Sequence, residues 1–310
     1  MPIFPSFFVN KTGGYEIEQS LRFDGSAQLN RTVGNNGGAR SFTYSVWLKK
    51  SIQGEQNFSM LVSMASDDSE WAYFNFGESS GDADQITCRS KTSSGYVFST
   101  SPARKYRDPS AWMHLVLKVD KSANTATGYV NGEQVGGTAG AGGWTFNKAV
   151  TGDTLRIGTN LDGYLAEAVF VDNQALDPAS FGEYDDNNLW RPIDVSGLTF
   201  GTNGFYLKFD PTATNGIGHD HSGNGNHFTA SGFTTSGTGT DVMSDTPTNN
   251  FATVSPLNIN VQNVLSDGNL TLNLNSSVAY KPTSTIAIPS SGKFYFEGTI
   301  QGGASQATPA

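Results

Sequence analysis

The sequence predicts an all-β protein: a sandwich of antiparallel sheets from about Leu21 to Val171, with very little helix in the whole chain. Two segments, 41–49 and 164–171, alternate with a period of two, which is typical of strands with one buried face. Clusters rich in Gly, Ser, Asn and Asp separate the apolar runs, as turns separate the short strands of a sandwich. These clusters lie at 34–38, 67–69, 79–84 and 136–143.

The elements are expected in the following order. Residues 1–19 form an N-terminal arm, and strands follow at 41–49, 71–76, 115–119, 128–135, 155–158 and 162–171. Asn131 and Gly132 tolerate the positive φ of a two-residue hairpin turn, so we expect a hairpin centred on them. A short helix is expected after Asp177, which can cap it, with Pro178 in its first turn.

The strand over 162–171 contains a single carboxylate in its middle, Glu167. Strict alternation divides its side chains between two faces of the sheet. We expect Tyr164, Ala166, Ala168 and Phe170 on one face, and Leu165, Glu167, Val169 and Val171 on the other.

The remainder of the chain has a different composition. Residues 20–195 are predicted to form the sandwich domain, and 196–252 a Gly/Ser/Thr/Asn-rich extension that lies along the sandwich or along a neighbouring subunit. Residues 253–310 are expected to form either part of a second β module or an oligomerisation segment. Strands are predicted in this third of the chain at 204–210, 270–274 and 293–298.

Composition and charge exclude several classes of function. The chain has 310 residues, a net charge of −9 and a pI of about 4.8, so we expect neither nucleic acid nor an anionic membrane as a partner. Cys88 is the only cysteine, so no intrachain disulfide is expected, which favours synthesis in a reducing compartment. The N-terminus lacks the basic region and apolar core of a signal peptide.

The order of several short motifs resembles the laminin-G-like, concanavalin-A-like jelly roll, in the version found in virion proteins of tailed phages. The motifs are Phe23-Asp24-Gly25, Trp112-Met113-His114, Val130-Asn131-Gly132-Glu133 and the segment 162–176. Residues 292–298 resemble the opening strand of a SPRY-like module.

This resemblance implies a structural virion protein without catalytic residues, either a tail fibre or adhesin or a capsid fibre or decoration protein. It would be assembled in the cytoplasm of the bacterial host. Its expected partners are host surface glycans, other virion proteins and identical copies of itself, most simply in a trimer. Two alternatives stay open: an enzyme that degrades host polysaccharide, and a pure assembly protein without a ligand.

Candidate binding residues follow from side-chain chemistry. Retaining glycosidases need two carboxylates about 5 Å apart, and no second carboxylate shares the strand face of Glu167. Tryptophan rings stack on sugars, and Trp144 and Trp71 are the candidates for glycan binding.

Calcium is the candidate cofactor, because it is bound by carboxylates on loops and strand ends. The candidate ligands are Asp67, Asp162 and Asp172. A histidine metal site around His219 and His221 is the weaker hypothesis, because Asp220 between them more simply accepts hydrogen bonds from the amides of a turn that begins at Ser222.

Overall fold

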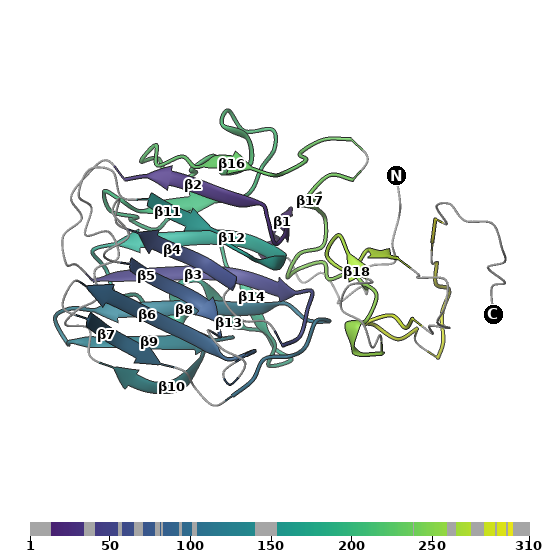
Figure 1. Ribbon diagram of the computed structural model, residues 1–310, viewed down its shortest axis with the longest axis horizontal. Helices are drawn as coiled ribbons and strands as arrows, with labels where there is room; N and C mark the ends of the chain where they lie inside the picture. The colour runs from purple at the N-terminus through teal and green to yellow at the C-terminus, as the bar shows by residue number, and fades with distance from the viewer. Residues whose placement is uncertain are drawn as a thin grey trace.

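The protein is a two-sheet sandwich with a less regular segment attached at one end, as seen in a computed structural model (Figure 1). The structure describes residues 14–33, 41–54, 58–64, 71–77, 81, 83–92, 95–100, 104–139, 154–237, 239–258, 265–273, 282–288, 290–295 and 297–299. The helices of these residues are short 3₁₀ turns: η1 Pro178–Ser180, η2 Gly216–Gly218 and η3 Pro256–Asn258. The predicted all-β class is therefore confirmed, and no helix of the described residues is long and apolar enough to span a bilayer.

An eight-stranded sheet forms one layer of the sandwich. Its strands are hydrogen bonded in the order β10-β9-β8-β3-β12-β1-β17, and β15 pairs with β12 beside this path. Their bounds are β1 Ser20–Asp24, β3 Phe42–Lys50, β8 Met113–Asp120, β9 Thr125–Val130, β10 Glu133–Ala139, β12 Asp162–Asp172, β15 Phe205–Leu207 and β17 Val242–Met243.

The second layer has seven strands in the order β16-β2-β11-β4-β5-β6-β7. Their bounds are β2 Gln28–Thr32, β4 Phe58–Met64, β5 Trp71–Phe76, β6 Ile86–Thr92, β7 Gly95–Thr100, β11 Thr154–Ile157 and β16 Thr229–Ser231. Two small hairpins complete the described elements: β13 Gly182–Tyr184 with β14 Trp190–Pro192, and β18 Leu265–Ser266 with β19 Thr271–Leu272.

The main core lies between the two sheets. As the alternation predicted, β3 directs Phe42, Tyr44, Val46 and Leu48 into it. The outer face of the eight-stranded sheet is also covered, because Val116 and Val171 pack with Phe181, Val195 and Phe200 from the segment after β12. The hairpin predicted at Asn131 and Gly132 is confirmed by φ values of 49° and 80°.

The predicted division of the β12 side chains into two faces is wrong beyond Ala166. The pairing of β12 with β3 shifts by one residue between Ala166 and Val169, and Glu167 has a φ of 45°. This is a β-bulge, in which one extra residue reverses the alternation that follows it. Consequently Leu165 and Ala168 both belong to the core between the sheets.

The segment after residue 196 is built into the sandwich. Strand β15 pairs with β12, β16 with β2 and β17 with β1. Phe205, Leu207 and Phe228 are buried in the main core. Of the two arrangements open from the sequence, the extension therefore lies along the sandwich of its own chain.

Two further predictions were only partly correct. The helix after Asp177 is a single 3₁₀ turn, and the Asp177 side chain pairs with Lys118 instead of capping that turn. In the last third of the chain the strand expected at 270–274 is reduced to β19, and the described residues within 293–298 form no strand.

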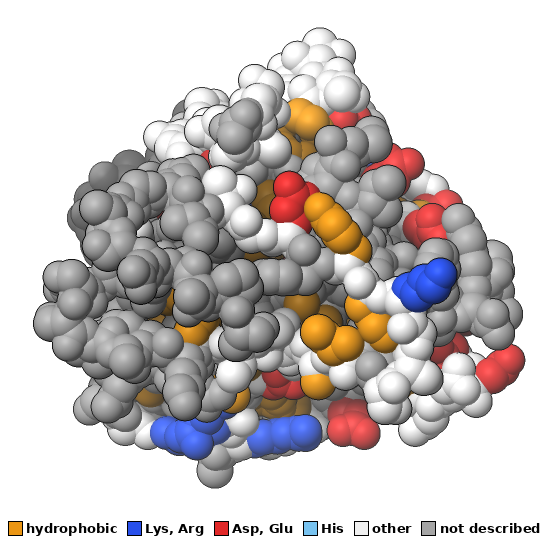
Figure 2. All heavy atoms as spheres, turned by 90° about the vertical axis from the view of Figure 1, so that its right-hand side faces the viewer, with side chains coloured by type: hydrophobic (Ala, Val, Ile, Leu, Met, Phe, Trp, Pro, Cys, Tyr) orange, Lys and Arg blue, Asp and Glu red, His pale blue; other side chains and the backbone are white. Residues whose placement is uncertain are grey.

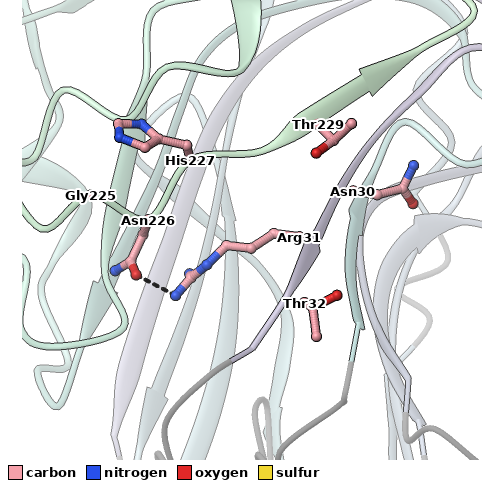
Figure 3. Close-up of a pocket in the computed structure, with 7 residues that line it drawn as sticks. All are labelled: Asn30, Arg31, Thr32, Gly225, Asn226, His227 and Thr229. Carbon is pink, nitrogen blue, oxygen red and sulfur yellow. Dashed lines mark hydrogen bonds between the residues drawn. The ribbon is translucent and has the colours of Figure 1, made fainter. Parts of the chain in front are cut away.

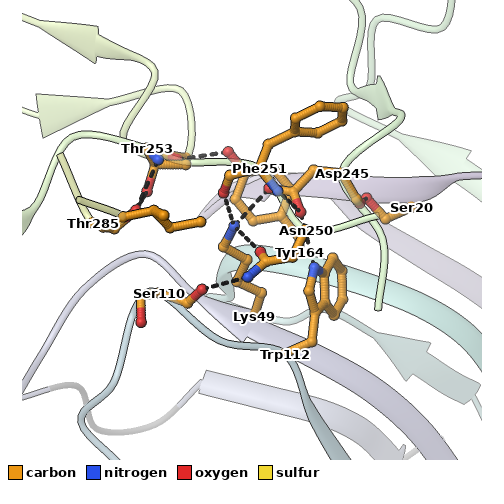
Figure 4. A network of polar contacts seen from close by, with 12 residues as sticks. Ser20, Lys49, Ser110, Trp112, Tyr164, Asp245, Asn250, Phe251, Thr253 and Thr285 are labelled. Carbon is orange, nitrogen blue, oxygen red and sulfur yellow. Dashed lines mark hydrogen bonds and ion pairs between the residues drawn. The ribbon is translucent and has the colours of Figure 1, made fainter. Parts of the chain in front are cut away.

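A buried ion pair attaches the segment around 245–251 to the outer side of β3 (Figure 4). The Lys49 ammonium is fully buried and donates to Asp245 Oδ2 at 2.7 Å, to Asn250 Oδ1 at 2.8 Å and to the Phe251 carbonyl at 2.6 Å. The other Asp245 oxygen accepts a hydrogen bond from Trp112 Nε1 at 2.9 Å. Burial lowers the pKa of Lys49, and the Asp245 charge opposes this shift.

Replacing Asp245 by Asn should cost about 3–5 kcal/mol of the free energy of unfolding, because the Lys49 charge would stay buried without its counter-ion. Urea unfolding at neutral pH measures this loss. Asp177→Asn is the matched control: its pair with Lys118 is exposed and should contribute about 0–1 kcal/mol. Equal small losses in the two variants would contradict the anchoring role of Lys49.

Candidate functional site

A polar pocket of about 360 Å³ lies at the edge of the seven-stranded sheet, where β2 meets β16 (Figure 3). One wall comes from β2 and β16, on which Asn30 and Thr229 are direct neighbours in register. The other wall is the loop that enters β16. The lining residues are Asn30, Arg31, Thr32, Gly225, Asn226, His227 and Thr229.

Arg31 supports the floor of the pocket. Its side chain is largely buried, and it donates to the Asn203 carbonyl at 3.2 Å and to Asn226 Oδ1. Burial lowers the pKa of Arg31, while the negative charges of Asp220 and Asp172 oppose this shift. Because these carboxylates offset its charge, Arg31 acts as an anchor for the loop and gives the pocket little preference for anions.

Asp220 fixes the shape of the loop wall. Its carboxylate accepts hydrogen bonds from the backbone amides of Tyr206 at 2.9 Å, Ser222 at 2.9 Å and Asn226 at 2.8 Å. The turn predicted from the sequence around Asp220 is therefore confirmed. The pocket is thus held in place by a buried carboxylate, without dependence on a ligand.

Side-chain amides of the loop add further hydrogen bonds that hold this wall in place. Asn224 Nδ2 donates to the Gly201 carbonyl at 2.6 Å, and Asn226 Nδ2 donates to the Gly204 carbonyl at 2.8 Å. Gly204 itself has no room for a side chain, since an added Cβ would lie 1.9 Å from the Phe200 carbonyl oxygen. The loop around Asn226 and the turn around Gly204 therefore form one rigid unit.

The groups that the pocket offers to a ligand are neutral amides and hydroxyls. The described lining includes no Asp or Glu, and its ionisable side chains are Arg31 and His227. The volume lies near the lower end of the range for small-molecule pockets, about 300–1,000 Å³. Such a pocket can exchange hydrogen bonds with a ligand rich in hydroxyl groups, and it lacks the paired carboxylates of a retaining hydrolase.

This pocket was not predicted from the sequence. Trp144 lies outside the described residues, and Trp71 lies on β5, three strands away from β2, with its side chain outside the described part of the structure. Whether either tryptophan binds glycan stays a prediction. The available signal was the Asn- and Gly-rich stretch 224–227, but its partner strand β2 is about 200 residues earlier in the chain.

The candidate calcium ligands are not brought together. Asp67 lies outside the described residues, and Asp162 and Asp172 are at opposite ends of β12, about 33 Å apart at the usual rise of a strand. Asp172 Oδ2 instead accepts hydrogen bonds from the backbone and side-chain nitrogens of Asn203, both at 3.1 Å. No group of three or more His, Cys, Asp or Glu in the described part of the chain could hold a metal ion.

Asp162 is an unusual carboxylate. Burial raises its pKa to about 6, and the negative charges of Asp24 and Asp267 contribute to the rise, whereas Arg22 opposes it. Asp24 lies directly opposite Asp162 in the β1–β12 register.

Glu167, at the bulge of β12, is buried and already occupied by protein groups. Its Oε1 accepts hydrogen bonds from the hydroxyls of Tyr206, at 2.5 Å, and Tyr15. Burial raises the pKa of Glu167, and these two hydrogen bonds oppose the shift. The carboxylate secures residue 15 of the N-terminal arm against the outer face of the sheet, where a substrate could not reach it.

Comparison with known proteins concerns mainly the sandwich. The family model described as the concanavalin A-like lectin/glucanases superfamily matches residues 21–180. A search of the curated proteins finds no match.

Several solved structures are similar in fold. The native heptameric SAP-like pentraxin of Limulus polyphemus is 16% identical, with 53% of this chain and 80% of that chain covered and a TM-score of 0.39. A putative carbohydrate binding protein of Bacteroides ovatus is 15% identical, with 70% and 59% covered and a TM-score of 0.49. The CBM40 of the Ruminococcus gnavus IT-sialidase, bound to α2,3 sialyllactose, is 12% identical, with 53% and 96% covered and a TM-score of 0.39.

Asp162→Asn should stabilise the protein at pH 7.5, by up to about 2 kcal/mol, and should have little effect at pH 4. The folded pKa of about 6 lies above the ordinary value of 3.8, so the folded state favours the protonated carboxyl. This contribution is present at low pH and is lost as the pH rises through about 6. Melting temperatures at the two pH values measure it.

The same experiment tests the calcium hypothesis. If calcium binds at Asp162, millimolar calcium should raise the melting temperature of the unmodified protein at pH 7.5, relative to EDTA, and should leave that of Asp162→Asn unchanged. An identical response of the two proteins to calcium would argue against a site at this residue.

Proposed function

The chain belongs to the concanavalin A-like lectin/glucanases superfamily, and from that premise we propose that it is a non-catalytic module that binds neutral glycans through the polar pocket at β2 and β16. The observation that carries the proposal is the pocket itself. Its loop wall is fixed by Asp220 and Arg31, and its lining also includes Asn30 and Thr229.

The chemistry of the lining supports a glycan ligand. A sugar hydroxyl donates one hydrogen bond and accepts others, and the amide of Asn30 and the hydroxyl of Thr229 can each do both. Because the walls are already ordered, a ligand would lose little affinity to the ordering of protein side chains. The net charge of −9 and the charge-compensated Arg31 favour a neutral saccharide over an anionic one.

Binding without catalysis is the interpretation that the described carboxylates favour. Glycoside hydrolysis needs two carboxylates that flank the substrate. The lining residues that the structure describes contain none, and Glu167 is enclosed by Tyr15 and Tyr206. The alternative of a polysaccharide-degrading enzyme would require a pair of carboxylates outside this pocket.

We propose further that the module belongs to a structural appendage of a tailed-phage virion, assembled in the cytoplasm of the bacterial host. The support is the order of its sequence motifs and the single cysteine, Cys88, which is buried and free. A tail fibre or adhesin and a capsid fibre or decoration protein are both compatible with these features. In either place the module would bind the host surface weakly per copy and strongly through several copies.

The segment 253–299 supports self-association. In the described part of the sandwich, the exposed large hydrophobic side chains are Tyr184 and Leu189. The segment 253–299 is shorter than the sandwich, yet it exposes more large hydrophobic side chains: Leu257, Leu270, Ile288, Phe294 and Tyr295. Figure 2 shows the face at this end of the molecule, where hydrophobic side chains reach the surface between polar ones.

The occupant that we propose for this surface is an identical copy, in a trimer. The segment carries few charges, whereas the chain as a whole is acidic, so copies repel one another least where these segments meet. Another virion protein, or the completion of a SPRY-like module, is the alternative. A pure assembly role without a ligand would retain this interface and make the pocket dispensable.

The double substitution Asn30→Ala and Thr229→Ala should reduce binding to a responding glycan by about tenfold or more, since each missing hydrogen bond to a ligand contributes about 0.5–1.5 kcal/mol. A glycan array that includes bacterial surface polysaccharides identifies the ligand, and calorimetry measures the reduction. Ser231→Ala, on the same exposed strand but outside the pocket, is the control and should bind normally. Silence of the whole array, or equal binding by both variants, would refute the pocket as a glycan site.

Light scattering should find the full chain as a trimer, and the double substitution Leu257→Ser and Ile288→Ser should shift it towards the monomer. Both side chains are more than half exposed, so the change should leave the melting temperature of the sandwich unaltered. Leu189→Ser removes a similarly exposed leucine that precedes β14 and should leave the trimer intact. A monomeric full chain would contradict the proposed interface.

A further inference from the structure

Three of the four histidines of the chain lie together in the loop between β15 and β16. The ring centroid of His219 is 4.7 Å from that of His221 and 4.7 Å from that of His227, and the rings of His219 and His227 are stacked at 28°. All three residues are partly buried. His227 also lines the polar pocket (Figure 3), so the cluster and the pocket share a residue.

The observed conformation requires a neutral His227. Its Nδ1 accepts a hydrogen bond from the backbone N–H of Asp220 at 3.0 Å. The ring proton must then be on Nε2, because Nδ1 uses its lone pair for this hydrogen bond. A second proton would have to be placed on Nδ1, where an N–H would face an N–H. Protonation of His227 and this hydrogen bond therefore exclude each other.

His221, in the same cluster, is also disfavoured in its charged form. Burial and the nearby His219 lower the pKa of His221, and Lys208 acts in the same direction, while Asp210 and Asp220 oppose the shift. His221 Nε2 is buried and has no hydrogen-bond partner among the described residues. The ring of Tyr206 packs against His221, and Arg31 on β2 reaches the same loop through Asn226.

Asp220, whose amide would be released by protonation of His227, is also the residue that organises the pocket wall. Its amide donates to His227, while its carboxylate accepts from the backbone amide of Asn226. Asn226 in turn accepts from Arg31 and lines the pocket. Loss of the hydrogen bond to His227 would thus remove one support of Asp220, whose carboxylate holds Asn226 in the pocket wall.

We propose that the histidine cluster is a proton-operated latch on the pocket: with His227 neutral it holds the loop 219–227 closed against β2, and protonation of His227 on acidification releases the Asp220 amide and opens the pocket wall. Histidine is the side chain that ordinarily changes charge between about pH 5 and 8. The predicted decrease of saccharide binding on acidification rests on the proposed function, but the opening of the loop does not.

The test follows the latch without any ligand, on the full-length protein. Histidine ring nitrogens are titrated by NMR from pH 7.5 to 5, and hydrogen exchange of the Asp220 and Asn226 amides is measured over the same range and corrected for intrinsic rates. By linkage, opening should become about tenfold more favourable for each pH unit below the titration of the ring. The Phe228 amide, which donates to the Gly218 carbonyl at 2.8 Å, is the internal control and should stay protected.

The variant His227→Asn distinguishes the effect of His227 protonation from a general loss of structure in acid. His227→Asn places an amide oxygen where Nδ1 accepts the Asp220 N–H, and this oxygen does not titrate, so the protection of Asp220 should change less than about twofold between pH 7.5 and 5.5. The latch is refuted if His227 titrates while Asp220 keeps its protection, if Asp220 and Phe228 lose protection together, or if the variant behaves like the unmodified protein. A silent glycan array would instead refute the proposed function and leave this result unaffected.

Discussion

The buried pair of Lys49 and Asp245 is the interaction on which the arrangement of the C-terminal half depends. The two residues are 196 positions apart in sequence, yet their charged atoms lie 2.7 Å apart with almost no solvent access. A buried ammonium is stable only when its donors are satisfied, so the segment 245–251 must follow one path over β3. That path places β17 beside β1 and brings the described residues beyond 253 to the same end of the sandwich.

Lys50, the next residue on β3, forms a similar buried ion pair on the opposite face of the sheet. Lys50 donates to Asp84 Oδ1 at 2.6 Å, and the Asp84 carboxylate also accepts from the Gly54 amide and from Arg107. Successive residues of a strand point to opposite faces, so one strand end secures the loops on both sides of the eight-stranded sheet. Together with Asp220 in the pocket wall, these hydrogen bonds share one feature: a buried aspartate outside the named strands accepts hydrogen bonds from backbone amides and, at Asp245 and Asp84, from a lysine of β3. Charged residues make up only 15% of the chain, and several of them take part in these buried interactions.

Local patterns in the sequence were sufficient for the class of fold and for much of the sandwich. The alternation over 41–49, the Asn131-Gly132 hairpin and the Asp220 turn depend on neighbouring residues alone, and each is present in the structure. The bulge at Glu167 could not be predicted, because a partly buried arm and Tyr206 stabilise its left-handed backbone from distant parts of the chain. Strand β15 lies within the strand predicted at 204–210, but its pairing with β12 could not be predicted, and neither could the pocket, since in both cases the partner strand is more than 30 residues away in sequence.

The position of the pocket follows from the way the fold protects an edge. Strand β2 would be the exposed edge of the seven-stranded sheet, and β16 covers it through three residue pairs. A covering strand of this length needs further support, which the Asp220-centred loop supplies immediately before it. The pocket is the space between this support and the edge that it covers. Its outer residues, such as Thr229, can therefore vary without disturbing the core, whereas Asp220 and Arg31 cannot, because they hold the edge cover in place. A single structural requirement, closure of a sheet edge, thus provides both the rigidity and the variable surface that a binding module needs.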